Sequence, residues 1–252
     1  MRMGSHRYQG DEIAVTYEVK RCIHATECVR GLPSVFDPER RPWVRLEGAS
    51  AEEVVRVVER CPTGALRYER SDGTVEAAAL VNEVTPSPDG PLYARGEIVL
   101  QDALGMEIAR ELRLALCRCG GSANKPYCDG QHRKLGFSDP GEVPPPPVPS
   151  AAATAAAGGP VGGAPGGAVA GVSAPAAPGT GATAPGAARL LGGALHIILT
   201  KNGPLRLLGP VVVRSTATGV ACPAQRLSLC RCGGSQNKPY CDGSHGRIGF
   251  EA

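Results

Sequence analysis

Six cysteines and two histidines lie in two copies of one short segment. The first copy runs from Cys117 to His132, and it recurs 113 residues later, from Cys230 to His245, with only two of sixteen positions changed. Chance does not reproduce a pattern this closely, so one small unit is used twice. The spacing C-x-C-x8-C-x3-H gathers three thiolates and one imidazole at little cost in loop-closure entropy. We therefore expect a metal site in each copy.

The ligand set by itself leaves the identity of the metal open. Tetrahedral Cys3His coordination suits zinc as well as iron. Gly120 and Gly121 let the backbone approach the metal, and the N–H groups at the start of a helix favour anionic thiolates. A structural zinc site and an iron site are both consistent with this chemistry.

A third group of cysteines lies upstream of the repeats. Cys22 and Cys28 are followed at a distance by Cys61 and a proline. This resembles the bacterial ferredoxin pattern C-x2-C-x2-C with a distant C-P, except that Ala25 replaces the middle cysteine. Three buried structural cysteines are the alternative interpretation. His24 is the nearest substitute ligand, but it lies one position from the missing cysteine, so we do not assign it.

The N-terminal cysteines need a small scaffold, and its elements can be predicted. Residues 14–20 alternate between apolar and polar side chains, as a strand does. Ser50 and Glu53 form a capping box, and the valines that follow lie on one face of a short helix. Pro62 prevents that helix from continuing past Cys61.

Each repeat is expected to be all-β up to its metal motif. Residues 92–101 and 109–116 indicate two strands around a turn, and their counterparts are 205–214 and 224–229. The last cysteine then opens a single helical turn with Asp129 as its N-cap. A cysteine and a histidine at i and i+4 lie on one side of such a turn.

Composition favours several small modules. The chain of 252 residues has 57 Gly and Pro (34 and 23) and few large aromatic side chains. Its cores must be small, so we expect bound metal to stabilise them. We predict an α+β protein, with a ferredoxin-like module followed by two β-rich modules. A disordered Pro/Ala/Gly linker joins the repeats, and its reach of about 40 Å lets them pair within one chain. The predicted boundaries are 12–72, 80–139, 140–189 for the linker, and 190–252.

Several classes of protein are excluded by the same composition. The first residues lack the apolar stretch of a signal peptide, so ten cysteines are better explained by a reducing cytoplasm than by disulfides. No apolar run is long enough for a membrane span. The net charge of +3 is small and the basic residues are scattered along the chain, which argues against a nucleic-acid partner.

The repeated motif C-x-C-x2-S-x3-P-x-C-D-G-x-H closely resembles the signature of the CDGSH iron-sulfur (mitoNEET-like) family. The resemblance covers about residues 84–137 and 197–250. It implies a [2Fe-2S] cluster in each repeat, with two thiolates on the inner iron and one cysteine and the histidine on the outer. Gln131 departs from the small residue that the family prefers, but it is not a ligand position. The implied ligands are Cys117, Cys119, Cys128 and His132, then Cys230, Cys232, Cys241 and His245.

A single histidine ligand has chemical consequences. Neutral imidazole in place of a thiolate raises the reduction potential, and protonation of the coordinating nitrogen would release the outer iron. Lys125 and Lys238 are candidate cofactor-binding residues that could tune such a site, although ordinary solvated lysines are an equal alternative.

The segment around the upstream cysteines is similar to the divergent mono-cluster ferredoxin domain over roughly residues 14–70. Three cysteines, Cys22, Cys28 and Cys61, then imply a [3Fe-4S] cluster, or a [4Fe-4S] cluster with one non-cysteine ligand.

No catalytic triad, phosphate loop or acid–base pair is visible, so we do not expect an enzyme. The first hypothesis is a multi-cluster electron carrier with a redox partner protein. The second is a redox- or iron-responsive donor that passes clusters to an apo-protein. The third is a zinc-stabilised interaction scaffold.

Overall fold

The computed structural model describes residues 4–144 and 192–252. The N-terminal part forms a three-stranded antiparallel sheet in the order β1-β2-β3, with two short α-helices. Its elements are β1 (Ser5–Gln9), β2 (Ile13–Glu18), η1 (Val19–Arg21), α1 (Glu27–Gly31), η2 (Leu46–Gly48), α2 (Ala51–Val58) and β3 (Leu66–Arg70). The strand expected over 14–20 is β2, whose last two expected residues lie in a 3₁₀ turn instead. A ferredoxin-like architecture for this part stays a prediction.

Helix α2 begins at the predicted capping box. The Ser50 hydroxyl accepts a hydrogen bond from the Glu53 backbone N–H (3.3 Å), and the Glu53 carboxylate accepts one from the Ser50 N–H (3.0 Å). Val54, Val57 and Val58 are buried against the sheet. The helix ends at Val58, which leaves Cys61 in the loop that leads to β3.

Each repeat contains three strands and a single helical turn. The predicted strands 92–101 and 205–214 are confirmed, whereas the second strand of each repeat begins two or three residues earlier than expected. The first repeat has β4 (Glu83–Pro86), β5 (Leu92–Gln101), β6 (Glu107–Leu116) and α3 (Gln131–Lys134); the second has β7 (Leu195–Leu199), β8 (Leu205–Arg214), β9 (Ala221–Leu229) and α4 (Ser244–Arg247). No helix in the described ranges has the length and apolar character needed to span a bilayer.

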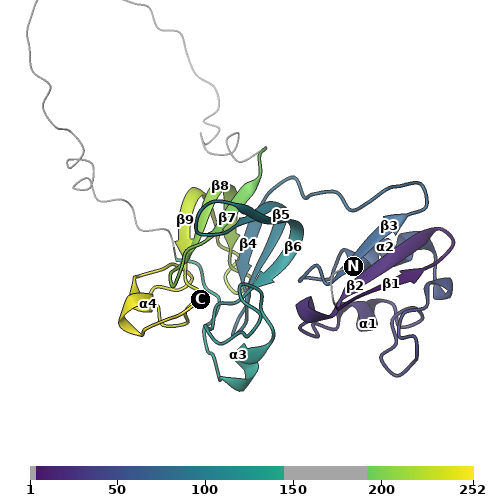
Figure 1. Cartoon of the computed structure of the whole chain (residues 1–252), viewed down its shortest axis with the longest axis horizontal. Coiled ribbons are helices and arrows are strands. Elements are labelled where there is room, and N and C mark those ends of the chain that lie inside the picture. The colour runs from purple at the N-terminus through teal and green to yellow at the C-terminus, as the bar shows by residue number, and fades with distance from the viewer. Residues whose placement is uncertain (1–3, 145–191) are drawn as a thin grey trace, which may run out of the picture. The chain divides into compact units, whose positions relative to one another are not determined.

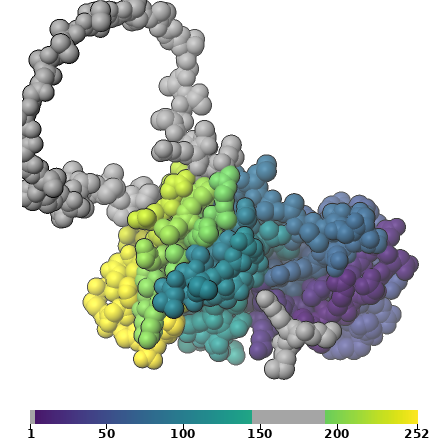
Figure 2. All heavy atoms as spheres, turned by 45° about the horizontal axis from the view of Figure 1, so that its top comes forward, coloured from purple at the N-terminus to yellow at the C-terminus, as the bar shows by residue number. Residues whose placement is uncertain are grey.

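The short strand of each repeat pairs with strands of both repeats. Strand β4 pairs antiparallel with β5 of its own repeat and parallel with β8 of the other, while β7 pairs antiparallel with β8 and parallel with β5. All six strands therefore belong to one sheet (Figure 1). The space-filling view shows the green and yellow atoms of the second repeat directly against the teal atoms of the first (Figure 2). Buried leucines and valines of both repeats form a single core.

A buried asparagine ties the repeats together where β5 bends. Asn82 donates from its amide to the carbonyls of Gly193 and Pro210 (both 3.0 Å), and its carbonyl accepts from the Glu97 N–H (2.8 Å). Gly96 lies beside it with φ of 135°, and a Cβ there would come within 2.2 Å of the Asn82 carbonyl oxygen. One amide thus satisfies three backbone groups and requires glycine next to it.

Residues 140–144, which the sequence places at the start of the linker, pack against the second repeat. Val143 is 3% exposed within the shared core. The carbonyl of Gly141 accepts from the Ser215 hydroxyl (2.9 Å), and that of Pro144 accepts from Tyr240 (3.1 Å). The rest of the predicted linker, residues 145–189, lies outside the described residues.

Replacement of Asn82 with alanine is expected to destabilise the shared sheet by about 2–3 kcal/mol, because buried backbone groups lose their partners. Gln101→Ala is the matched control, since that amide bonds only the carbonyl of Gly105 on an exposed turn; its effect should stay below about 0.5 kcal/mol. Urea unfolding followed by circular dichroism measures both. Equal losses in the two variants would contradict the role of Asn82.

Candidate metal centres

The first repeat groups its four predicted ligands in two pairs by folding the chain back on the end of β6. Cys117 directly follows the strand, and its N–H donates to the Pro126 carbonyl (2.8 Å), while the Cys128 N–H donates to the Ala115 carbonyl (2.9 Å). The Sγ atoms of Cys117 and Cys119 lie 3.8 Å apart. Cys128 Sγ lies 3.3 Å from Nδ1 of His132.

The second repeat has the same arrangement. The sulfurs of Cys230 and Cys232 are 3.6 Å apart, and Cys241 Sγ is 3.4 Å from Nδ1 of His245. Each site therefore presents a pair of cysteines and a separate cysteine–histidine pair. Across the described residues, no three Cys, His, Asp or Glu side chains converge as they would around a single ion.

An aspartate holds each ligand loop in shape. Asp129 accepts from the Ala123 N–H (2.8 Å) and from the Gln131 N–H (3.1 Å). The residue at the N-cap of α3 is Gly130, with φ of 86°, so the expected N-cap at Asp129 lies one position too early. The Gly130 N–H points to Cys128 Sγ (3.4 Å), and such N–H groups stabilise thiolates and raise the reduction potential of a bound cluster.

The buried thiols of the first site fit a metal cofactor. Burial raises the pKa of Cys128 to about 11 and lowers that of His132, whose neighbour Arg133 acts in the same direction. A buried thiolate needs a compensating positive charge, and iron would supply it. The neutral imidazole is the form that binds metal.

The glycines of the motif serve the contact between repeats. Cys119 and Cys232 form an isolated antiparallel bridge. A Cβ on Gly120 would lie 2.6 Å from the Cys232 carbonyl oxygen, and one on Gly233 would lie 2.8 Å from that of Cys119. Close approach of the two ligand loops therefore requires glycine at both positions.

The two lysines of the motif lie across the same contact. The ammonium of Lys125 donates to the Ser122 carbonyl (2.9 Å) and sits 5.8 Å from the ring centre of Phe250 in the other repeat. Lys238 is placed reciprocally, 5.9 Å from the ring of Phe137. Both lysines thus have partners on the protein, including cation–π contacts that join the repeats.

The three N-terminal cysteines line one cavity of about 510 Å³, together with Tyr17 and Trp43. Cys22 follows η1, Cys28 lies in α1 and Cys61 follows α2. Burial raises the pKa of Cys28 to about 11, so this site also favours a bound cation. The cavity fits a metal cluster held by three thiolates.

His24 lies beside the N-terminal cysteines, with its backbone N–H 3.4 Å from Cys22 Sγ, and Cys222 lies in the shared core. His24 is exposed with φ of 55°, although it borders the N-terminal cavity. Cys222 is buried in the shared core opposite Val213 in the sheet register, where it acts as a small apolar side chain.

The environments of the two repeat sites differ. Cys128 and His132 are 3% and 6% exposed, whereas Cys241 and His245 are half-buried. Ile23 of the N-terminal part packs on Cys128, with Ala25 and Tyr93 beside it. Sequence reasoning missed this cover. Its one signal is that Tyr93 aligns with a charged residue, Arg206, in the second repeat.

Two family models match the N-terminal part and both repeats. The family model described as "Divergent 4Fe-4S mono-cluster" matches residues 8–71, and that described as "Iron-binding zinc finger CDGSH type" matches residues 89–133 and 202–246. "Uncharacterized protein YjdI" of Escherichia coli strain K12 is 38% identical over 66 residues, which are 26% of this chain and 87% of that protein. Its counterpart in strain O157:H7 gives the same values. No solved structure matches.

These matches define an iron-sulfur protein. The chain contains two CDGSH-type iron-binding repeats and an N-terminal divergent 4Fe-4S mono-cluster domain.

Substitution of Cys128 by serine is expected to lower the iron and acid-labile sulfide content of the purified protein, because one ligand pair loses its sulfur. Cys222→Ser should leave both unchanged, since that side chain lies in the core away from the ligand pairs. Iron and sulfide assays after anaerobic purification test this. Equal metal loss in both variants would contradict the assignment.

Proposed function

We propose that this protein is an electron carrier. It would hold a [2Fe-2S] cluster with three cysteines and one histidine in each repeat, and a [3Fe-4S] or [4Fe-4S] cluster in the N-terminal domain. The observation that carries the proposal is the grouping of ligands: two pairs in each repeat, and three cysteines around one cavity. Such clusters supply one-electron redox chemistry when bound.

The paired ligands favour a two-iron cluster over a single zinc ion. The two cysteines that follow β6 or β9 would hold one iron, and the cysteine and histidine at the helical turn would hold the other. A structural zinc site would instead draw all four ligands to one centre at 2.0–2.3 Å, as tetrahedral coordination demands. The zinc scaffold is therefore the weaker alternative.

The chain's own residues then set potential and access. Imidazole at His132 and His245 raises the potential relative to an all-cysteine site. Backbone N–H groups point to the sulfurs of Cys128, Cys232 and Cys241 (each 3.4 Å). We assign no catalytic reaction to the chain, and its partner under this proposal is a redox protein.

Reversible reduction tests the electron-carrier role. The anaerobically purified protein should accept electrons from a reduced ferredoxin and return them to an oxidised one, with its iron and sulfide retained over repeated cycles. Optical spectra and electron paramagnetic resonance report the redox state. Irreversible bleaching after one cycle would argue against a carrier.

A second candidate function, donation of a cluster to an apo-protein, is favoured by the exposure of the second repeat. Cys241 and His245 are half-buried, whereas the equivalent pair of the first repeat is buried. Solvent reaches the outer ligands of the second site more readily, so protonation and exchange of its histidine are easier. The second site is therefore the candidate for donation.

His245→Cys should slow acid loss from the protein and lower the potential of the second site, because a thiolate replaces a protonatable neutral ligand. In the wild-type protein, loss should be faster at lower pH, because protonation of the imidazole competes with its coordination. Visible absorbance against time at several pH values, with a redox titration, measures both effects.

His132→Cys is the matched control for that experiment. Because His132 is already shielded, the same substitution there should change the early phase of acid loss much less than His245→Cys does. Identical kinetics in both variants and the wild-type protein would reject histidine ligation at the second site. Transfer to apo-ferredoxin that is faster at lower pH would support donation, and retention of the cluster under those conditions would count against it.

A further inference from the structure

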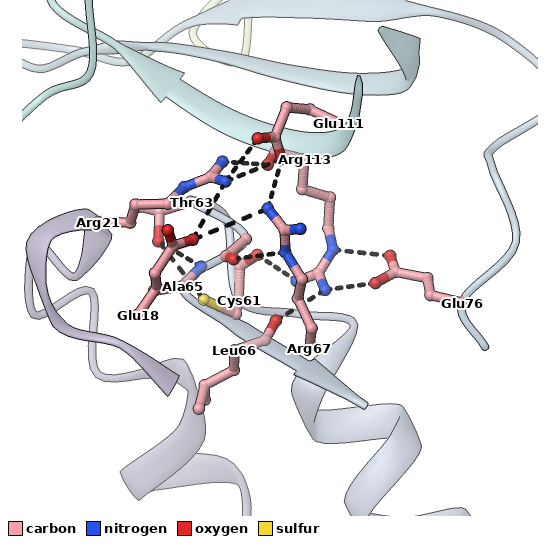
Figure 3. Close-up of polar contacts among 11 residues, drawn as sticks. Glu18, Arg21, Cys61, Thr63, Ala65, Leu66, Arg67, Glu76, Glu111 and Arg113 are labelled. Atoms are coloured by element: carbon pink, nitrogen blue, oxygen red, sulfur yellow. Dashed lines mark hydrogen bonds and ion pairs between the residues drawn. The ribbon is translucent and has the colours of Figure 1, made fainter. Parts of the chain in front are cut away.

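A buried ion pair joins the N-terminal domain to the first repeat. The guanidinium of Arg21 donates to both carboxylate oxygens of Glu111 on β6, each at 2.8 Å (Figure 3). Arg21 is 3% exposed and Glu111 is 4% exposed. Arg67 of β3 also donates to Glu111 (2.6 Å). Charges buried this deeply need fixed partners, so their pairing specifies how the two surfaces meet.

Arg113, two residues further along β6, reaches the metal-binding loop of the N-terminal domain. Its Nη1 donates to the carbonyl oxygens of Val58 (2.7 Å) and Cys61 (2.5 Å), and its Nη2 donates to that of Leu66 (3.1 Å). Glu76 neutralises the charge of Arg113. A side chain of the first repeat thus fixes the backbone of an N-terminal ligand, as Figure 3 shows.

The network balances its charges. Arg21, Arg67 and Arg113 face Glu18, Glu76 and Glu111. Of these, Glu18 contacts both Arg21 (3.6 Å) and Arg67 (3.9 Å). These six side chains therefore carry no net charge together.

An apolar contact lies beside the ion pairs and links the ligands of the two sites. Ile23, next to the ligand Cys22, packs with Ala115 and the ligand Cys128. Tyr93 packs against this cluster. Protein atoms in van der Waals contact thus fill the space between a loop that carries Cys22 and the outer ligand pair of the first repeat.

The second repeat lacks these features. The position of Glu111 is taken by Ala224, that of Tyr93 by Arg206, and that of Ala115 by Ser228. The equivalent of Arg113 is Arg226, which is exposed. The N-terminal domain is therefore built to dock on the first repeat alone.

We propose that the N-terminal domain is a built-in electron donor to the first repeat, positioned by Arg113 and Glu111; this inference rests on the electron-carrier function proposed above. One electron leaves the N-terminal site, which is oxidised by one electron, and enters the first-repeat site, which is reduced by one. A one-electron carrier protein reduces the N-terminal site first. Histidine ligation raises the potential of the acceptor, which favours this direction.

Rapid-mixing experiments on the full-length protein test the proposal. His245→Cys serves as the background, because it makes the spectrum of the second site distinguishable from that of the first. The loaded protein is mixed anaerobically with less than one equivalent of dithionite, and freeze-quenched samples are followed by electron paramagnetic resonance. We expect the electron to pass from the N-terminal to the first-repeat site at a rate that does not depend on protein concentration.

Arg113→Met should slow this internal step by about tenfold or more, because a fixed geometry is lost. Glu111→Gln, which keeps the shape of the side chain, should slow it in the same direction. Arg226→Met is the matched control and should leave the rate unchanged. Equal rates in R113M and R226M would overturn the proposal.

Two further outcomes separate this inference from the proposed function. If the sites of the wild-type protein cannot be reduced and reoxidised reversibly, the electron-carrier function fails, whatever the interface does. If they cycle but the internal step depends on protein concentration, the built-in donor alone is overturned. Magnetic coupling between the reduced N-terminal and first-repeat sites can be measured without an interface variant. Its absence would also overturn the donor role.

Discussion

Both metal sites of the repeats depend on the short strands β4 and β7, each of which pairs with a long strand of its own repeat and with one of the other repeat. Neither repeat has a complete sheet without the other, because β4 and β7 each pair with the long strands of both repeats. Their shared core then fixes the ends of β6 and β9, from which the ligand loops depart. A lone repeat would expose unpaired strand edges and half of an apolar core, which proteins of this size cannot sustain. The close approach of Cys119 and Cys232 accompanies the same pairing between the repeats.

Nearly identical ligand loops acquire different surroundings through contacts far away in the sequence. The N-terminal domain covers Cys128 with Ile23, and nothing in the described residues does the same for Cys241. Differences in exposure change how easily a histidine ligand meets protons and how strongly a site is desolvated. Two sites that arose from one repeated unit can therefore serve different steps, although their ligands are the same.

The sequence predicted those parts of the molecule that local chemistry determines. The capping box at Ser50, the strands β5 and β8 and the grouping of each cysteine with its histidine depend on residues close together in the chain. Sequence reasoning could not predict the strand pairing between repeats, the hydrogen bonds of the Asn82 amide or the contacts of Arg113. The partners in each case are distant in sequence, and no periodicity encodes them. The N-cap was misplaced at Asp129 because its side chain accepts a hydrogen bond from the N–H two residues further on, as an N-cap residue does, although the N-cap itself is Gly130.

Arg113 and Glu111 also bear on what the domain contact is for. Replacing a buried ion pair with apolar side chains of similar volume is often neutral or stabilising, whereas losing one partner costs about 3–5 kcal/mol. Stability alone is therefore a poor reason to bury Arg21, Arg113 and Glu111 between two small domains. What these charges provide is a single orientation, because each guanidinium can donate hydrogen bonds to oxygens at only a narrow set of positions. An electron path between sites needs a fixed orientation more than it needs a tight interface, and the placement of the Cys61 carbonyl against Arg113 meets that need.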